Sequence, residues 1–377
     1  MPLIQSTAGL EYDISSTIKR LTSKERLKVG VLQGYGAPDL YQELNNIRRV
    51  LERSYEIRPV YLDRNQMVPD DIQILLVASL TQDLNDWGKF AIDQFIMRGG
   101  RVAFLLNKVS ANLQTSQASP SPLRIDDWTQ KYGFKINNDL VMDRRCGMIN
   151  VQQQMGFFTV TNAVQYPFFP KITSFNPQSP MVKDLENIML FFPSTIDTSR
   201  ADSAYLQVTP LFYTSNQAQL QRGRYDINPM QRVQYATFNE GPFVLGVALS
   251  GVFHSYFEGR EIPRGDSSTV IPADLKIATV SPETRLVVIG DGHIAQDAYM
   301  TDPSNVTFLL NLVDWLALDE GLIQIRTREV TSRPLADISQ GAKTTIKYAN
   351  IFLPPAVVIL IGLVRWQIRR RKKNLEF

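Results

Sequence analysis

The stretch DIQILLVASLTQDLNDWGKFAIDQFIMRGGRVAFLLN, residues 71–107, decides the class of fold. It holds two nearly continuous apolar runs, at 71–79 and 101–107, separated by a segment with helical spacing that closes in a glycine pair. Apolar runs without alternation are typical of strands that are buried on both faces of a sheet. The stretch therefore predicts a strand–helix–strand unit of an α/β protein.

The same alternation extends upstream of this unit. The run LKVGVLQG at 27–34 predicts a strand, 38–54 predicts a helix that Asp39 could cap, and 56–62 predicts another short strand. Together these elements predict a mostly parallel, doubly wound sheet with helices on its faces.

The pattern returns late in the chain. Residues 285–292 predict a buried strand, 305–318 an amphipathic helix capped within 302–305, and 321–330 a last strand. A sheet that opens near residue 27 and regains strands near residue 285 indicates a single domain that carries a large insertion.

The middle of the chain has a different character. Residues 110–124 are polar and predict a loop, 125–133 predict a short helix, and 141–240 predict short strands broken by prolines. We therefore expect an α/β domain over 27–330 with a β-rich insertion at about 135–280.

A run of apolar residues lies close to the C-terminus. With its flanks, IFLPPAVVILIGLVRWQIRRRKK (351–373) predicts a transmembrane helix over 348–368, with Pro354 and Pro355 in its first turn. Neither a buried core helix nor an interfacial helix fits, because the run has no polar stripe and ends in a basic cluster at 369–377.

The basic tail predicts the orientation of the chain. The positive-inside rule places 369–377 in the cytoplasm and the domain outside it, at the inner (cytoplasmic) membrane, with 331–347 as the linker. The lead-in at 1–26 has no apolar signal segment. Export of the domain would then need a signal upstream of this sequence. The chain would be either the back part of a longer protein with earlier membrane helices or a piece cut from one. The alternative is the reversed orientation, with the domain in the cytoplasm.

Composition excludes several classes of function. The formal net charge is +3, and the basic tail more than accounts for it, so no nucleic-acid surface is expected. One cysteine, Cys146, rules out a disulfide framework within the chain, and with only two histidines, His254 and His293, the composition argues against a Cys/His zinc site. We expect Cys146 to be a small packed residue and His254 to be a hydrogen-bonded strand residue.

Two turns at the ends of predicted strands are candidate ligand sites. Gly34 and Tyr35, in VLQGYG, could cradle a phosphate at a helix N-terminus or form a tight turn, but the motif is neither a dinucleotide fingerprint nor a P-loop. Asp291, His293 and Asp297 follow another strand, where open α/β sheets bind ligands. They could hold a metal, although an aspartate there more often caps a turn.

The strand–helix–strand order of 71–107 resembles the class I glutamine amidotransferase fold, in which a cysteine nucleophile follows a strand. Here the corresponding elbow falls at 107–110 and contains no cysteine. Ser110 with His293 as its base would make a hydrolase, the enzymatic alternative. Our expectation is no enzyme, no cofactor and a catalytic fold reused for binding.

Several stretches together resemble the GldG-like family, gliding-motility-type auxiliary components of ABC transport systems. They are LKVGVLQGYG (27–36), TPLFYTSNQA (209–218), GPFVLGVALSG (241–251), RLVVIGDG (285–292), NVTFLLNLVDWLALDEGLIQIRTR (305–328) and NIFLPPAVVILIGLVRWQIRRRKK (350–373). The chain departs from that family because it begins at MPLIQ without an N-terminal membrane helix.

The resemblance implies an amidotransferase-like domain without catalytic residues, outside the cytoplasm. It also implies two partners, an ABC-2-type permease and a separate cytoplasmic ATPase. The predicted anchor adds membrane lipids. ABC systems are usually two-fold, so a homodimer within the complex is a further option, but the sequence does not show whether two copies assemble. The alternative is a stand-alone anchored binding or structural protein. The aromatic stretch 157–171 is either an exposed partner surface or a satellite core under loops.

Overall fold

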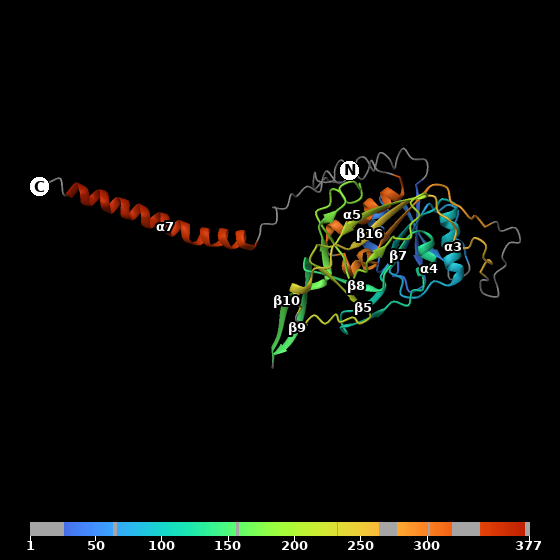
Figure 1. Cartoon of the computed structure of the whole chain (residues 1–377), viewed down its shortest axis with the longest axis horizontal. Coiled ribbons are helices and arrows are strands. Elements are labelled where there is room, and N and C mark those ends of the chain that lie inside the picture. The colour runs from blue at the N-terminus through green and yellow to red at the C-terminus, as the bar shows by residue number, and fades with distance from the viewer. Residues whose placement is uncertain are drawn as a thin grey trace. The chain divides into compact units, whose positions relative to one another are not determined.

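The computed structural model describes residues 26–62, 66–155, 158–231, 233–263, 277–300, 302–318 and 340–373. The chain divides into two compact units, the first ending at Thr331 and the second beginning at Ser332. The first unit is a mixed α/β body built on one large sheet (Figure 1). The described part of the second unit is one long helix, and it is treated separately.

Among the described residues, the central sheet has eight strands in the order β11-β14-β16-β17-β4-β3-β1-β2. Five adjacent strands are mutually parallel, as the apolar runs predict. They are β1 (Lys28–Gln33), β2 (Glu56–Tyr61), β3 (Ile74–Ala78), β4 (Arg101–Leu105) and β17 (Thr284–Ile289). The β-α-β-β-α-β order expected upstream of residue 107 is confirmed.

Three antiparallel strands continue this sheet beyond β17. They are β16 (Val244–Gly251), β14 (Leu206–Tyr213) and β11 (Ser174–Phe175). All three come from the stretch 135–280, so the predicted insertion contributes strands to the central sheet. The late strand β17 lies in the middle of the sheet, between β4 and β16.

Helices cover both faces of the sheet, and alternate strand residues point to each. On one face, α3 (Asp86–Met97) and α4 (Asp126–Lys131) pack with Leu286 and Val288 of β17. On the other face, α2 (Asn45–Leu51) and α5 (Pro303–Leu316) pack with Val287 and Ile289. This two-sided burial is why the parallel strands read as continuous apolar runs.

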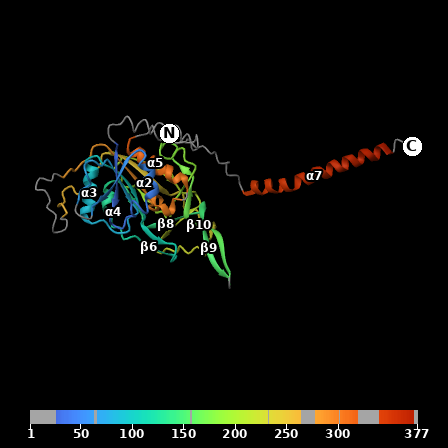
Figure 2. The ribbon, with the colours of Figure 1, turned by 180° about the vertical axis from the view of Figure 1, so that it is seen from behind.

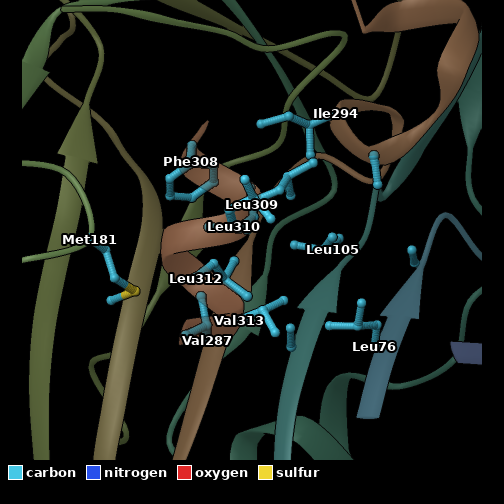
Figure 3. Packing of buried hydrophobic residues seen from close by; sticks show 14 of the residues in the cluster. Leu76, Leu105, Met181, Val287, Ile294, Phe308, Leu309, Leu310, Leu312 and Val313 are labelled. Carbon is cyan, nitrogen blue, oxygen red and sulfur yellow. The ribbon is translucent and has the colours of Figure 1, made fainter. Parts of the chain in front are cut away.

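The α5 helix provides much of the core on its face. Leu309, Leu312 and Val313 lie against Leu76 of β3 and Leu105 of β4 (Figure 3). All five are buried, and they surround an apolar void of about 20 Å³, too small to be a ligand site.

The helix ends follow from the local sequence. The Asn85 side chain accepts a hydrogen bond from Gly88 N at 2.7 Å and caps α3, while Gly99, at φ 91°, ends it. Asp302 caps α5 by accepting from Ser304 N at 2.9 Å, as the sequence predicts. The helix predicted over 38–54 is wrong in extent, because only Asn45–Leu51 is helical. The Asp39 carboxylate binds Tyr41 N and Gln42 N instead, which forms a turn ahead of the helix.

A buried carboxylate on α3 ties three segments together. Asp93 is fully buried, and its oxygens accept hydrogen bonds from Tyr132 OH at 2.6 Å and Ser255 Oγ at 2.7 Å. They also accept from Tyr256 N at 2.8 Å and Gln94 Nε2 at 2.9 Å. Burial and the Asp93 charge raise the pKa of Tyr132 well above its usual value.

Small sheets make up the rest of the middle region. The prediction of a loop at 110–124 is wrong, because β5 (Val109–Asn112) and β6 (Gln117–Pro120) form a hairpin there. The remaining short strands are β7 (Lys135–Ile136), β8 (Asp139–Asp143), β12 (Ile188–Met189), β13 (Ile196–Asp197) and β15 (Ala218–Arg222). The predicted short helix at 125–133 is confirmed as α4.

The longest strands form a hairpin, β9 (Cys146–Met155) and β10 (Phe158–Ile172), that extends away from the body (Figures 1 and 2). The expectation of only short, proline-broken strands is therefore wrong here. Pro167 lies where the register between β9 and β10 is interrupted, so its missing N–H costs no ladder bond with β9. The inner end of β10 does join a satellite core, through Tyr166, Phe168 and Phe169.

Two buried asparagines on α5 hold the middle region in place. Asn305 exchanges two hydrogen bonds with the backbone of Met189, each 2.9 Å long. Asn311 donates to Met181 O at 3.1 Å. Both asparagines are fully buried, so these bonds fix the segment 181–189 against α5.

The second unit is α7 (Gln340–Lys373). Its segment Lys347–Trp366 is long and apolar enough to cross a membrane. The prediction that Pro354 and Pro355 lie in the first turn is wrong, because the helix begins at Gln340 and both prolines are inside it. The strand predicted at 321–330 lies outside the described residues.

Candidate functional site

The four predicted site residues lie at the carboxyl edge of the parallel strands. Gly34 and Tyr35 follow β1, and Asp291 and His293 follow β17. In the sheet, β4 and β3 separate β17 from β1. The structure therefore places the two pairs on one edge but at different points along it.

Asp291 is a fully buried carboxylate that fastens the middle region to this edge. Its Oδ2 accepts a hydrogen bond from Phe191 N at 2.7 Å, and its Oδ1 accepts from His293 N at 2.8 Å. Asn107, just after β4, completes this hydrogen-bond network. Its Oδ1 accepts from Gly292 N at 2.7 Å, and its Nδ2 donates to Phe192 O at 3.0 Å. Both oxygens of the Asp291 carboxylate thus accept hydrogen bonds from the protein backbone.

His293 belongs to the same hydrogen-bond network. Its Nδ1 lies 3.2 Å from Phe191 O and 3.3 Å from Asp291 Oδ1. Two acceptors at this nitrogen favour the tautomer that carries its proton there. The ring packs on Tyr299, with centroids 4.8 Å apart, and burial raises the pKa of the Tyr299 hydroxyl.

Asp297 is used elsewhere. Its Oδ1 accepts from Asn46 N at 3.0 Å, and its own N–H donates to Glu43 O at 2.8 Å, which joins this loop to the start of α2. Within the described ranges, no group of three His, Cys, Asp or Glu side chains is placed to hold a metal ion. The metal alternative for Asp291, His293 and Asp297 therefore gains no support.

The loop after β1 is bridged to the loop after β3. Residues Gly34, Tyr35 and Gly36 have positive φ angles of 84°, 52° and 68°. Thr81 Oγ1 donates to Gly36 O at 3.0 Å, and Gln82 N donates to Tyr35 O at 2.9 Å. The helix α2 begins only at Asn45, so this loop does not lead directly into a helix, which the phosphate hypothesis required.

The elbow after β4 is occupied by a lysine. Lys108 is buried, and its Nζ donates to Leu123 O and to Asp126 Oδ1, both at 2.7 Å. Ser110 lies beyond it in β5, paired with Ser119 and exposed beside an open hollow that Tyr225 also lines. Of the contacts that the structure describes, none joins Ser110 to His293, whose Nδ1 faces Phe191 O and Asp291. The other histidine, His254, forms an isolated bridge with Val280.

Cys146 is half-buried at the base of β9, and burial raises the pKa of its thiol to about 11. We expect the native protein to react with iodoacetamide at pH 8 at least tenfold more slowly than the urea-unfolded chain, because the reactive thiolate is scarce. Mass spectrometry of timed samples measures both rates. Equal rates would contradict the shift and show an accessible, reactive thiol.

An open groove lies in the middle region, away from the sheet edge. It has a volume of about 370 Å³, and we call it the amide groove. It runs between the inner end of β10, strand β15 and the loop at 228–238. Its lining is Met142, Gln165, Tyr166, Pro167, Phe168, Gln219, Leu220, Gln221, Asn228, Pro229, Gln231, Val233, Gln234, Thr237 and Phe238.

The chemistry of the amide groove is neutral and hydrogen-bonding. Its floor is rigid, because Tyr166 is buried and its hydroxyl donates to Ile227 O at 2.7 Å. The side chains of Gln165, Gln231 and Gln234 are exposed at its rim, and none of the lining residues that the structure describes is charged. Amides donate and accept at once, so the groove suits an uncharged ligand rich in both kinds of group.

Sequence reasoning did not find this groove. The signal that was present is the density of glutamines at 217–234, which a polar loop explains equally well. The lining comes from Met142, residues 165–168 and residues 219–238, and only the fold brings these parts of the chain together.

Comparison with known proteins places the chain in a family. Residues 26–312 match the family model described as ABC-type uncharacterized transport system, an auxiliary component. A protein of Borreliella burgdorferi described as uncharacterized is 21% identical over 390 residues, covering 99% of this chain and 72% of the relative. The solved mmIFT52 N-terminal domain aligns with a TM-score of 0.46 at 10% identity, over 77% of this chain and 97% of that one.

The family match covers most of the body and runs from just before β1 to well inside α5. This chain therefore belongs to the family of auxiliary components of ABC-type uncharacterized transport systems.

Proposed function

We propose that this protein is a non-catalytic, membrane-anchored auxiliary subunit of an ABC transport system. One observation carries the proposal: an α/β body of a transport-auxiliary family is followed by a helix whose segment Lys347–Trp366 can cross a bilayer. The side chains described there are exposed, including Phe352 and Leu353. An apolar helix surface of this length needs lipid or another helix to cover it.

The proposal includes an orientation. Five basic residues at 369–373 favour a cytoplasmic tail, and the body then lies outside the cytoplasm at the inner membrane. An ABC-2-type permease, fused upstream or separate, and a cytoplasmic ATPase are the proposed partners. The closer relation to the GldG-like family and the amidotransferase-like origin of the fold are part of the same proposal.

A binding role for the body has a structural basis. The candidate base and metal residues at the sheet edge, Asp291, His293 and Asp297, are engaged in fold-stabilising contacts, whereas the amide groove is open and its rim is exposed. We therefore assign the binding of a substrate or envelope partner to this groove. The alternative is a stand-alone anchored binding protein, which would have the same groove without transporter partners.

Affinity purification from membranes tests the proposal. With a tag on the basic tail and mild detergent, we expect a permease and an ATPase to copurify in fixed stoichiometry. In intact spheroplasts, added protease should digest the body and spare the tail tag. Recovery of the chain alone in several detergents would refute the transporter role, and digestion of the tag with survival of the body would refute the orientation.

A groove variant refines the same experiment. Gln234→Trp fills the amide groove, and Gln178→Trp places the same side chain at an exposed position in a turn outside the groove lining. We expect Gln234→Trp to abolish the transport phenotype while permease and ATPase still copurify, because the anchor is unchanged. Equal activity of the two variants would remove the groove from the mechanism.

A further inference from the structure

The part of the β9–β10 hairpin from Cys146 to Pro170, which we call the arm, carries no charged residue. No Asp, Glu, Lys or Arg occurs between Arg145 and Lys171. The arm extends from the body (Figures 1 and 2), and among its described side chains those at the inner end, with Ile149 at the margin, pack on the satellite core. A two-stranded hairpin standing alone in water is only marginally stable, so a long arm needs something that covers it.

The register divides the arm into two unlike faces. Residues directly opposite each other in an antiparallel pair share a face, and the pairs Ile149–Val164 and Val151–Asn162 lie on the same side as Val160. The other side carries amides, hydroxyls and small groups, through the pairs Asn150–Ala163 and Gln152–Thr161, together with Met148. One face is therefore mainly apolar and the other mainly polar.

The apolar face is accessible. Val160 is 38% exposed, and Val151 and Val164 are partly exposed. The outer edge of β9 is also unprotected, because it has none of the lysines, prolines or bulges that normally block pairing of an edge strand. Exposed edges and β-branched faces without charge are surfaces that proteins keep covered.

The chemistry of the arm selects its partner. A lipid surface would call for lysine, arginine or tryptophan beside the apolar face, and the arm has none of these residues. The arm offers no charges with which a charged partner protein could form ion pairs. A second copy of the same face meets it with no charge repulsion and with apolar groups on both sides, which is the self-complementarity that a two-fold interface requires.

We propose that the apolar face of the arm, centred on Val151, Val160 and Val164, is a self-association surface on which two copies of this chain pack as a closed two-fold dimer. The two valine-rich faces cover each other, and the amide faces remain in water. The inference is independent of the transporter role, because it rests on the register and composition of the arm alone.

The test uses two adjacent residues on opposite faces of β10. Val160→Lys places a charge on the apolar face, and Thr161→Lys places the same charge on the polar face, where it should be solvated. Full-length protein in detergent is examined by size exclusion with multi-angle light scattering, with the detergent mass subtracted. We expect the wild type and Thr161→Lys to have twice the chain mass of 42.8 kDa and Val160→Lys to have the single mass.

Association through apolar faces should also persist in 0.5 M salt. A monomeric wild type, or a Val160→Lys variant that stays dimeric, overturns the proposal; the second result would point to α7 or another part of the body. Loss of permease from Val160→Lys in the tail-tag purification, with a monomeric wild type, would assign the arm to that partner instead. Unchanged urea midpoints by tryptophan fluorescence show that the variants are folded.

Discussion

Replacing Asp93 with alanine is expected to lower the free energy of unfolding by about 4 kcal/mol. The substitution leaves Tyr132 OH, Ser255 Oγ and Tyr256 N, all of which donate to this carboxylate, without their acceptor in a buried site. It also opens a cavity between α3 and the segment at 255–256. Urea unfolding followed by the fluorescence of the buried Trp87 and Trp128 measures the loss.

The same helix supplies the control. Asp86 is exposed in the first turn of α3, where its charge favours the helix dipole by less than about 1 kcal/mol. Asp93→Asn keeps one acceptor oxygen and should recover about half of the lost stability. If Asp93→Ala and Asp86→Ala had equal effects, the network around Asp93 would not be a main support of the fold.

Replacing Asp291 with alanine is expected to cost about 3 kcal/mol, because Phe191 N and His293 N lose their buried acceptor. Whether the substitution lowers or raises the stability of the protein shows which role Asp291 has. A carboxylate kept for ligand binding is strained in the free protein, and its removal commonly stabilises the fold. A carboxylate that fastens two segments destabilises the protein when it is removed.

Thermal or urea unfolding of Asp291→Ala distinguishes these roles, with Asp127→Ala as the control at an exposed carboxylate of α4. We expect normal membrane insertion and a lower unfolding midpoint for Asp291→Ala, and a nearly unchanged midpoint for Asp127→Ala. A higher midpoint for Asp291→Ala would return this residue and His293 to the list of ligand-binding candidates.

The parallel part of the sheet was predictable because both of its faces are buried, which leaves unbroken apolar runs at 74–78 and 101–105. The arm was not predictable in the same way. Its strands alternate amides with valines, and β10 continues through Pro167 and Pro170, two residues that usually end a strand. The start of α2 was not predictable, because the sequence around Asp39 fits either a helix cap or a separate turn, and the structure has the turn.

The position of Asp291 and His293 at a strand end could be read from the sequence, but their role could not. That role depends on the backbone of Phe191, about a hundred positions earlier in the chain, which no local pattern connects to them. The amide groove was out of reach for the same reason, since strand pairing, not sequence proximity, assembles its rim.

The central place of β17 has a consequence for the order of events during synthesis. Strands β1–β4 and strands β11, β14 and β16 are made first, yet the two groups do not contact each other through the sheet until β17 is inserted between β4 and β16. A nascent chain therefore carries two half-sheets with open inner edges until residues beyond 289 are available. Because α5 also holds the segment 181–189 in place, the body is completed only when nearly all of it has been synthesised, and both inner edges stay unpaired until then. Unpaired strand edges of this kind make a folding intermediate prone to aggregation.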